Sequence, residues 1–381
     1  MPGVPPQRKS ILYFANEDSA FLLSRLPMAR FARDAGFDVH VATRNTGSAS
    51  KIAAEGFVVH DVPIRRGSQS LRSVWSTLAT ILALRRITAK LSPSIVHSSS
   101  LQCSVIGSLA MLGRNIRKVN GITGLGYVFT SADLRARILK GVLRLVLPAL
   151  FNRANCVVLV ENKDDKRELV TLGILDRQLI HIPGSGVDDA KFRPMPEPPG
   201  PITFAFVGRL LADKGIRALI AAHQSLWAKG HRLNLLIAGR PDPLNPASVS
   251  NQELQEWSNL PGISWLGHVD DVASVWRRSH FAVLPSRREG LPVSLLEAAA
   301  CGRSMVATDA PGCRDIAVQD QTGVLVPIDD VSSLADAILR LAESSELRTK
   351  FGRAARELVE RTYSARVVGH YTVQLYRSLC S

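Results

Sequence analysis

Residues 281–297 read FAVLPSRREGLPVSLLE, a stretch that predicts a strand, a loop and a helix in succession. The apolar run Phe281–Pro285 predicts a buried strand. A short loop follows, and Pro292 suits the first position of a helix that ends near Cys301. A strand, a loop and a helix in this order are typical of a parallel sheet covered by helices.

Two carboxylates occupy special places in this stretch. Glu289 lies in the predicted loop, and Glu297 lies about one and a half turns into the predicted helix. Open α/β sheets bind ligands at the carboxyl ends of their strands. Carboxylates accept hydrogen bonds from vicinal hydroxyls, and the free amides of Leu291, Val293 and Ser294 at the helix start suit a phosphate. The stretch therefore predicts a site for a phosphorylated, hydroxyl-rich ligand.

A second stretch of the same kind carries cations. Residues 203–215 read TFAFVGRLLADKG, where Arg209 follows a predicted strand and Lys214 precedes a predicted helix. Arginine offers a planar fork to phosphate oxygens, and lysine offers a compact charge. Fixed cations of this kind stabilise the charge that develops on a departing diphosphate. Together with the two glutamates, they indicate an enzyme that uses a nucleotide sugar.

Strands and amphipathic helices alternate through both halves of the chain. One long helix is expected over Phe21–Ala35, directly after the first strand. Residues 193–201 read RPMPEPPGP, and so many prolines predict a linker. The 381 residues are long enough for two domains. We therefore predict an α/β protein of two doubly wound, Rossmann-like domains, residues 1–185 and 186–364, followed by residues 365–381.

Composition places the chain among globular proteins, with 46% hydrophobic and 21% charged residues. The five cysteines form no Cys-x-x-Cys pair, so we expect neither a disulfide framework nor a zinc site, and a reducing cytoplasm as the location. No apolar run reaches about 18 residues, so no membrane span is expected.

The net charge of +14 is concentrated in the first half. Residues 1–185 hold 25 Lys and Arg against 12 Asp and Glu, whereas residues 186–381 hold 22 against 21. The candidates for an anionic partner are nucleic acid and a membrane surface. Residues 134–147 predict a basic amphipathic helix, which favours peripheral binding to the inner face of a membrane. Packing of this helix on its own sheet is the alternative.

Several motifs are absent. There is no Asp-x-Asp triplet, no Gly-x-Gly-x-x-Gly fingerprint and no Cys/His cluster with zinc spacing. A nicotinamide dehydrogenase is therefore disfavoured, and neither a metal nor another cofactor is expected. The low aromatic content of 6% and the lack of a module signature argue against nucleic acid.

These two charged stretches resemble the retaining glycosyltransferases of family 4, which have the GT-B fold. Glu289 and Glu297 match the Glu-x7-Glu motif of that family, and Gly208–Gly215 matches its basic loop. The segment Pro183–Asp188 is similar to the family's interdomain turn. The resemblance covers the whole chain and is most specific between residues 180 and 330.

The resemblance implies a fold and a role for each residue. The two domains would face a cleft, the first binding the acceptor and the second the donor, and the helix in residues 365–381 would return to the first domain. Arg209 and Lys214 would hold the donor diphosphate, Glu289 the hexose and Glu297 the ribose. The phosphates would contact the backbone amides of one loop, formed by Gly290, Leu291, Pro292 and Val293. The base would lie against the loops that contain Gly239 and Gly267, His268 and Val269.

The first half departs from the family pattern. Residues 16–19 read NEDS where many members have a Gly-Gly loop, and Arg25 follows Ser24 where a His-Arg pair is usual. His97 is the nearest match to a histidine that some members place at the reacting centre. Residues 121–129, GITGLGYVF, resemble bacterial members that act on polyprenyl-diphosphate-linked sugars.

The sequence thus predicts a metal-independent retaining glycosyltransferase that moves a hexose or N-acetylhexosamine, with UDP preferred to GDP in the donor. The acceptor would be a lipid-linked saccharide in cell-surface polysaccharide or lipopolysaccharide assembly. A nucleotide-sugar epimerase or hydrolase is the nearest alternative, and a basic nucleic-acid-binding protein is the alternative of another class.

Overall fold

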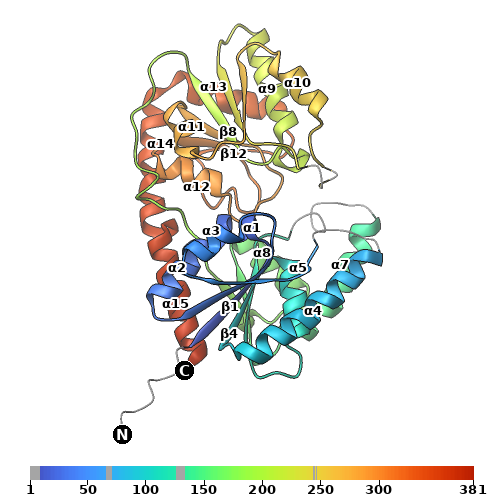
Figure 1. Ribbon diagram of the computed structural model, residues 1–381. Helices are drawn as coiled ribbons and strands as arrows, with labels where there is room; N and C mark the ends of the chain where they lie inside the picture. The colour runs from blue at the N-terminus through green and yellow to red at the C-terminus, as the bar shows by residue number, and fades with distance from the viewer. Residues whose placement is uncertain (1–8, 66–70, 126–133, 243–244, 246) are drawn as a thin grey trace. The chain divides into compact units, whose positions relative to one another are not determined.

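The computed structural model describes residues 9–65, 71–125, 134–242, 245 and 247–381. The chain forms two compact units. Unit 1 comprises residues 1–185 and 365–381, and unit 2 comprises residues 186–364. Each unit is a parallel sheet between helices, so the predicted doubly wound architecture is confirmed (Figure 1). Among the described residues, no helix is both long enough and apolar enough to span a bilayer.

Unit 1 has a seven-stranded parallel sheet in the order β3-β2-β1-β4-β5-β6-β7. The strand order reverses between β1 and β4, which is the place where such sheets bind ligands. The strands are β1 (Ser10–Glu17), β2 (Asp38–Arg44), β3 (Val58–Asp61), β4 (Ile95–Ser99), β5 (Arg117–Ile122), β6 (Cys156–Val160) and β7 (Leu179–His181). The helices are α1 (Asp18–Ser24), α2 (Leu26–Asp34), α3 (Ala49–Ala54), α4 (Leu71–Leu91), α5 (Leu101–Ala110), α7 (Leu134–Phe151), α8 (Lys163–Thr171) and α15 (Ala365–Cys380).

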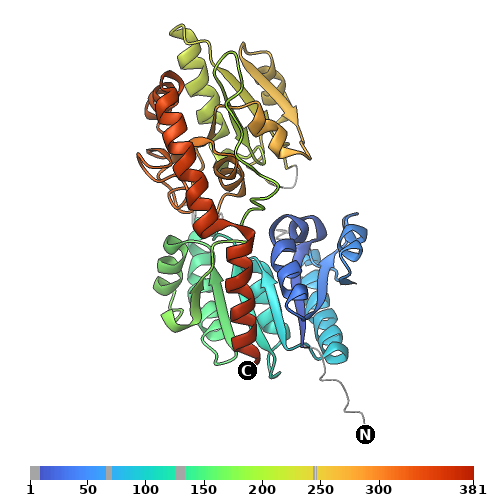
Figure 2. The same cartoon turned by 90° about the vertical axis from the view of Figure 1, so that its left-hand side faces the viewer.

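Both faces of the unit 1 sheet are apolar, because alternate residues of β1 point to opposite sides. Ile11 and Tyr13 belong to a core cluster that includes residues of α2 and α15. Leu12 and Phe14 belong to another cluster with residues of α4 and α5. Figure 2 shows α15 lying along unit 1.

Helix α15 packs closely against α2. A Cβ atom on Gly369 would lie 2.3 Å from the ring of Phe31, so only glycine permits this approach. Val368 and Tyr376 of α15 are fully buried in the unit 1 core. The final helix is therefore an integral part of unit 1.

Unit 2 has a six-stranded parallel sheet in the order β10-β9-β8-β11-β12-β13, around one large apolar core. Its strands are β8 (Thr203–Val207), β9 (Asn234–Ala238), β10 (Ile263–Gly267), β11 (Phe281–Leu284), β12 (Ser304–Thr308) and β13 (Gly323–Val326). Its helices are α9 (Ile216–Ala228), α10 (Asn251–Ser258), α11 (Val272–Arg277), α12 (Val293–Ala300), α13 (Val331–Glu343) and α14 (Ser345–Leu358), with a 3-10 turn at Ala212–Lys214 and a π turn at Val359–Tyr363.

The single helix predicted over Phe21–Ala35 is wrong, because α1 and α2 are separate helices. Arg25 lies between them with φ −131°, outside the helical region. Pro27 has no N–H to donate to the carbonyl of Leu23, so a continuous helix would lose a hydrogen bond there. The break places the Arg25 side chain in the interior of unit 1, where it is 3% exposed.

The proline-rich run 193–201 is not the connection between the units, contrary to the sequence-based prediction. It forms no helix or strand, yet it packs within unit 2. The buried Arg303 donates hydrogen bonds to the carbonyls of Met195 (3.1 Å) and Pro196 (2.7 Å), and also to Trp276 (3.0 Å). Glu197 forms a two-pronged ion pair with Arg348, with both N–O distances 2.8 Å. The prolines prevent regular secondary structure in this run, and Arg303 and Arg348 hold it against the rest of unit 2.

Arg303→Met should destabilise the protein by about 3 kcal/mol, because three carbonyl oxygens lose a charged donor. The free energy of unfolding, measured with urea, checks this expectation. Arg353→Met on the exposed surface of α14 is the matched control and should change stability by less than about 0.5 kcal/mol. Equal effects of the two substitutions would contradict the anchoring role of Arg303.

Candidate functional site

Three loops of unit 2 meet at the carboxyl ends of β8, β9 and β10. Gly239 has φ +146°, and a Cβ atom on it would lie 1.8 Å from the carbonyl oxygen of Gly208. The Gly239 amide also donates to the carbonyl of Gly267 (2.7 Å). Glycine is thus required at position 239, because the loops after β8 and β9 touch through their backbones.

The loop that carries Lys214 reaches the loop after β11 in the same way. Gly215 has φ +72°, and its Cβ would lie 1.9 Å from the carbonyl oxygen of Pro285. This approach places Lys214 Nζ 2.5 Å from both carboxylate oxygens of Glu289. The two side chains are 21% and 9% exposed. The structure therefore brings together one cation and one carboxylate of the predicted site as a half-buried ion pair.

Arg209 takes part in a different ion pair. Its Nη1 lies 2.8 Å from Oδ2 of Asp242, and its side chain is 48% exposed. Arg209 and Lys214 thus have separate carboxylate partners, although both lie at the carboxyl edge of the sheet. Asp242 was not predicted from the sequence as a site residue. Its position shortly after β9, beside Gly239, is the signal that could have found it.

The loop between β11 and α12 is held at both ends by backbone contacts. The amide of Glu289 donates to the carbonyl of Pro311 (3.0 Å). Gly312 has φ +77°, and its Cβ would lie 2.6 Å from the carbonyl oxygen of Gly290. Pro292 precedes the helix as its N-cap residue with ψ 107°, so the predicted first helical position is wrong by one residue. The fixed φ of proline suits both a helical and an extended residue. Pro292 is extended here, so the helix begins at Val293.

The start of α12 offers hydrogen-bond donors. Within the described chain, no acceptor is found for the backbone N–H groups of Leu291, Val293 and Ser294. Leu291 and Pro292 are buried, whereas Val293 is 37% exposed. Donors without an acceptor at a helix N-terminus attract anions.

Glu297 lies within α12, as predicted. Burial raises the pKa of Glu297 to about 8, and the positive charge of Lys191 opposes the shift. The carboxyl group is then mostly protonated at neutral pH and can donate a hydrogen bond as well as accept one.

His268 and Val269 follow β10 at the same edge of the sheet. His268 Nε2 lies 3.4 Å from Oδ1 of Asp270, and both side chains are largely exposed. Val269 is partly buried against the unit 2 core. The residues predicted to contact a base thus lie in one loop, next to Gly239.

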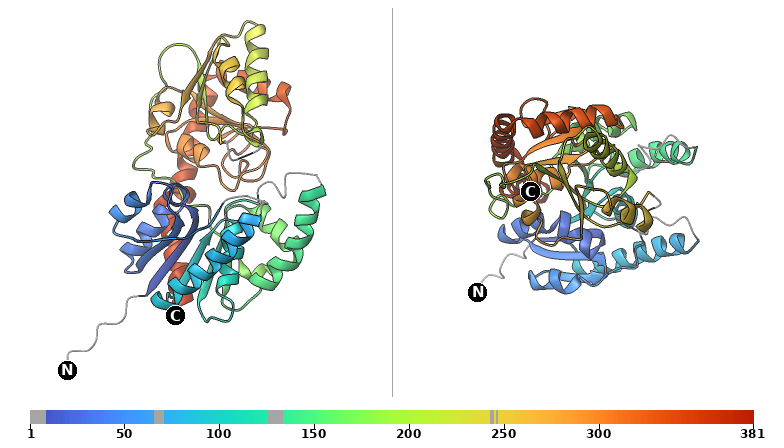
Figure 3. Two further views of the ribbon diagram at one scale, coloured as in Figure 1. Left: turned by 45° about the vertical axis from the view of Figure 1, so that its right-hand side comes forward. Right: turned by 90° about the horizontal axis from the view of Figure 1, so that it is seen from above.

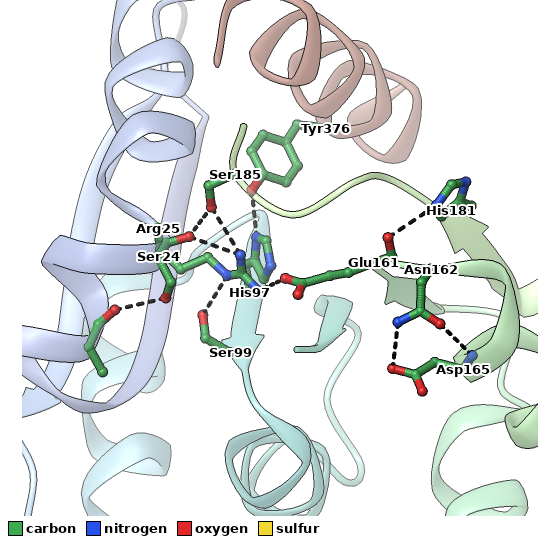
Figure 4. Close-up of polar contacts among 11 residues, drawn as sticks. Ser24, Arg25, His97, Ser99, Glu161, Asn162, Asp165, His181, Ser185 and Tyr376 are labelled. Carbon is green, nitrogen blue, oxygen red and sulfur yellow. Dashed lines mark hydrogen bonds and ion pairs between the residues drawn. The ribbon is translucent and has the colours of Figure 1, made fainter. Parts of the chain in front are cut away.

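Unit 1 contains a buried ion pair near the carboxyl ends of its central strands (Figure 4). Arg25 Nη2 lies 3.1 Å from Oε1 of Glu161, which directly follows β6. Arg25 also donates to Ser99 Oγ (3.2 Å) and to Ser185 Oγ (3.0 Å). Burial raises the pKa of Glu161, and the charge of Arg25 opposes this shift. Arg25 therefore links three parts of unit 1 by its side chain: Ser99 of β4, Glu161 after β6, and Ser185.

His97 lies beneath this ion pair and is fully buried. Its Nδ1 lies 2.5 Å from the Tyr376 hydroxyl, which lies 2.9 Å from the Tyr13 hydroxyl. Burial, together with the charge of Arg25, holds the pKa of His97 well below its usual range. When Tyr13 donates to Tyr376 and Tyr376 donates to His97, both hydroxyl protons have an acceptor. His97 then carries its proton on Nε2, which has no hydrogen-bond partner among the described residues.

Two other features of the first half have a structural explanation. Asp18 is buried and accepts hydrogen bonds from the amides of Ser19 (2.7 Å), Thr46 (2.9 Å) and Ser48 (2.7 Å). Burial opposes ionisation of Asp18, but these bonds and the Thr46 hydroxyl lower its pKa. Asp18 thus joins the start of α1 to the loop after β2 by side-chain contacts. Of the segment 121–129, residues 126–129 lie outside the described residues.

No group of three or more His, Cys, Asp or Glu side chains suited to a metal ion occurs in the part of the chain that the structure describes. The cations and the amide donors of unit 2 are the groups that can meet a diphosphate there.

Solved structures define the class of fold. The structure of HepE from Anabaena in complex with UDP superposes with a TM-score of 0.79, covering 98% of this chain and 100% of HepE at 15% identity. Two doubly wound units of this kind form the GT-B fold of glycosyltransferases.

Sequence comparison then identifies the family. Residues 187–358 match the family of glycosyl transferases group 1, and residues 10–161 match the family described as glycosyl transferase 4-like. The chain belongs to the glycosyltransferases of the family 4 type, and it is an enzyme. The resemblance stated from the Glu-x7-Glu motif is confirmed.

Two relatives are similar over most of the chain. The capsular polysaccharide biosynthesis glycosyltransferase CapM of Staphylococcus aureus is 24% identical over 368 residues, covering 91% of this chain and 92% of CapM. The N,N'-diacetylbacillosaminyl-diphospho-undecaprenol alpha-1,3-N-acetylgalactosaminyltransferase of Campylobacter jejuni is 23% identical, covering 92% of this chain and 94% of that protein.

Glu297→Gln should make stability less dependent on pH. A carboxyl group whose pKa is higher in the folded state stabilises fully below its unfolded value of 4.5, and this contribution is lost as the pH rises towards 8. The wild-type protein should therefore lose up to about 1.4 kcal/mol per pH unit in this window from Glu297 alone. Urea unfolding between pH 5 and 8 checks the slope. Identical slopes for wild type and Glu297→Gln would show that Glu297 is ionised in the fold.

Proposed function

We propose that the enzyme transfers a hexose or N-acetylhexosamine from a UDP-sugar to a lipid-linked saccharide, with retention of configuration. The product would serve cell-surface polysaccharide or lipopolysaccharide assembly. The proposed place of action is the cytoplasm, at the inner face of the membrane that holds the acceptor.

The Lys214–Glu289 ion pair carries this proposal. It lies at the carboxyl edge of the unit 2 sheet, beside the amides of Leu291, Val293 and Ser294 that lack an acceptor. A diphosphate bound there would meet a lysine and a helix N-terminus, while a sugar hydroxyl could donate to Glu289. A site of this composition suits a sugar linked to a diphosphate better than either a free sugar or a free phosphate.

Each remaining residue of unit 2 has a proposed task in donor binding. Arg209 and Lys214 stabilise the charge on the departing diphosphate, a contribution of several kcal/mol in a preorganised site. Protonated Glu297 binds the ribose hydroxyls. The loops at Gly239 and His268–Val269 hold the base. We further propose that the leaving diphosphate accepts the proton of the incoming hydroxyl on the same face, which gives retention.

His97 is proposed to act in unit 1 by positioning, since the side chain is fully buried. It lies beneath Arg25, and its Nε2 lies 3.2 Å from the place that a Cβ atom on Gly121 would take. This donor therefore lies close to the backbone at the end of β5.

The relatives support the choice of substrates. HepE binds UDP, as its structure is described, and the Campylobacter jejuni enzyme is named for a diphospho-undecaprenol acceptor. The CapM relative is named for capsular polysaccharide biosynthesis. UDP as the nucleotide and a lipid-linked saccharide as the acceptor follow from these names by analogy.

Lys214→Met and Glu289→Gln should each lower donor turnover by about a hundredfold or more, because each removes one side of the ion pair. Release of UDP from UDP-sugars is the measurement, with the circular dichroism of each variant as the test of folding. Lys229→Met, which alters an exposed lysine at the end of α9, is the matched control and should keep full activity. Full activity in a folded Lys214→Met variant would remove the proposed site.

Chelation should leave the activity unchanged. Two cations and three amides are proposed to meet the diphosphate charge without a metal ion. Initial rates before and after treatment with EDTA check this, with added Mg²⁺ and Mn²⁺ as the complementary arm. Loss of activity on chelation, restored by one of these ions, would overturn metal independence.

A screen of UDP- and GDP-sugars for slow hydrolysis would identify the donor. The product formed without an acceptor then separates the alternatives: an epimerase would convert the sugar nucleotide, whereas a transferase would release UDP slowly and faster once a lipid-linked saccharide is added. Rapid conversion of the donor alone would favour the epimerase or hydrolase.

A further inference from the structure

One side of unit 1 exposes many large apolar side chains. Helices α4, α5 and α7 lie on the same face of the sheet, and α5 contacts both of the others (Figures 1 and 3). Nine of the seventeen large apolar side chains exposed in the described chain belong to α4 and α7. These nine form what we call the α4–α7 surface: Val74, Trp75, Leu78, Leu82, Leu134, Ile138, Leu139, Val142 and Leu145.

The packing of α7 shows that this exposure does not come from an unpacked helix. Leu143, Leu147 and Leu150 are buried in a core cluster with residues of β6. The opposite stripe of the same helix remains in solvent, with Ile138 60% and Leu145 77% exposed. The alternative that α7 packs on its own sheet therefore accounts for one stripe and leaves the other unexplained.

Helix α4 repeats the pattern. Trp75 is 72% exposed, and Leu78 and Leu82 follow it at helical spacing with about half of their surface exposed. Leu84 on the other side is fully buried in the core. Exposed tryptophan and leucine side chains on two helices that both contact α5 form an apolar surface of a kind that monomeric proteins rarely present to water.

The charge on this layer has one sign. Helix α4 carries four Lys and Arg, α7 carries four, α5 carries none, and the three helices contain no Asp or Glu. Arg86 and Lys90 are exposed on α4, as are Arg137 and Arg144 on α7. Cations on long side chains that flank exposed leucines suit an interface between water and hydrocarbon.

We propose that the α4–α7 surface docks on an anionic lipid bilayer. The apolar side chains would enter the boundary of the acyl chains, and the basic side chains would contact lipid phosphates. A second copy of this chain fits less well, because a symmetric contact would place like charges opposite each other. Nucleic acid would match the cations but leave the leucines in water. This inference deepens the proposed function and rests on it for the membrane-bound acceptor.

Vesicle sedimentation tests the proposal. The full chain should bind vesicles of phosphatidylglycerol and phosphatidylethanolamine at low salt and fail to bind vesicles of phosphatidylcholine alone. Each cation near an anionic surface contributes about 1 kcal/mol, so Arg144→Glu should weaken binding at least about fivefold. Leu145→Glu should weaken it at least as much by removing an apolar contact. Binding that is equal for both vesicle types, or unchanged in both variants, would overturn the proposal.

Matched controls lie elsewhere on the molecule. Leu175→Glu replaces a leucine that is 40% exposed outside this surface, and Arg353→Glu reverses an exposed charge in unit 2. Both should bind vesicles like wild type. If the protein without vesicles is a dimer that Leu145→Glu dissociates, the occupant is a second copy and the bilayer proposal is wrong.

The failure of this inference is distinct from failure of the proposed function. UDP release by Arg144→Glu and Leu145→Glu should match wild type, since neither residue belongs to the donor site. Normal UDP release without vesicle binding in the wild type would overturn the docking surface alone. Vesicle binding without any turnover of sugar nucleotides would overturn the proposed function and leave the surface in place.

Discussion

Contact between backbones at the carboxyl edge of unit 2 is the constraint on which the proposed donor site depends. Gly239, Gly215 and Gly312 each touch a carbonyl oxygen of a neighbouring loop at a distance that leaves no room for a Cβ atom. Backbone hydrogen bonds also join these loops, from Gly239 to Gly267, from Arg287 to Asp213 and from Glu289 to Pro311. Charged side chains that extend from them, above all Lys214 and Glu289, therefore keep their relative positions through the sheet itself.

Much of the fold could be predicted because parallel strands buried on both faces are short, apolar runs. The strand predicted over Phe281–Pro285 is β11 (Phe281–Leu284), and the strand predicted before Arg209 is β8 (Thr203–Val207). The helices were harder to predict from the sequence than the strands. The break at Arg25 depends on the interior position of its side chain. The packing of the proline-rich run depends on Arg303, about a hundred residues away.

The charged residues that meet at the carboxyl edge of unit 2 could be named from the sequence, but their pairing could not. The basic stretch indicated cations beside a diphosphate, and the family resemblance implied a separate carboxylate beside a hexose. In the structure, Lys214 and Glu289 neutralise each other, and Arg209 pairs with Asp242. Such pairings depend on how loops after different strands fold over one sheet edge. The Arg25–Glu161 pair in unit 1 had no motif at all, because its partners are 136 residues apart.

The place of α15 has a consequence for biosynthesis. Val368 and Tyr376 complete the apolar core of unit 1, yet the ribosome makes them after all of unit 2. During translation the nascent unit 1 exposes the groove of β1 and α2 that these residues later fill, and His97 lacks its tyrosine partner. Transiently exposed apolar surface invites aggregation and chaperone binding. The apolar core of unit 1 is therefore completed only when α15 docks, after unit 2 has been made.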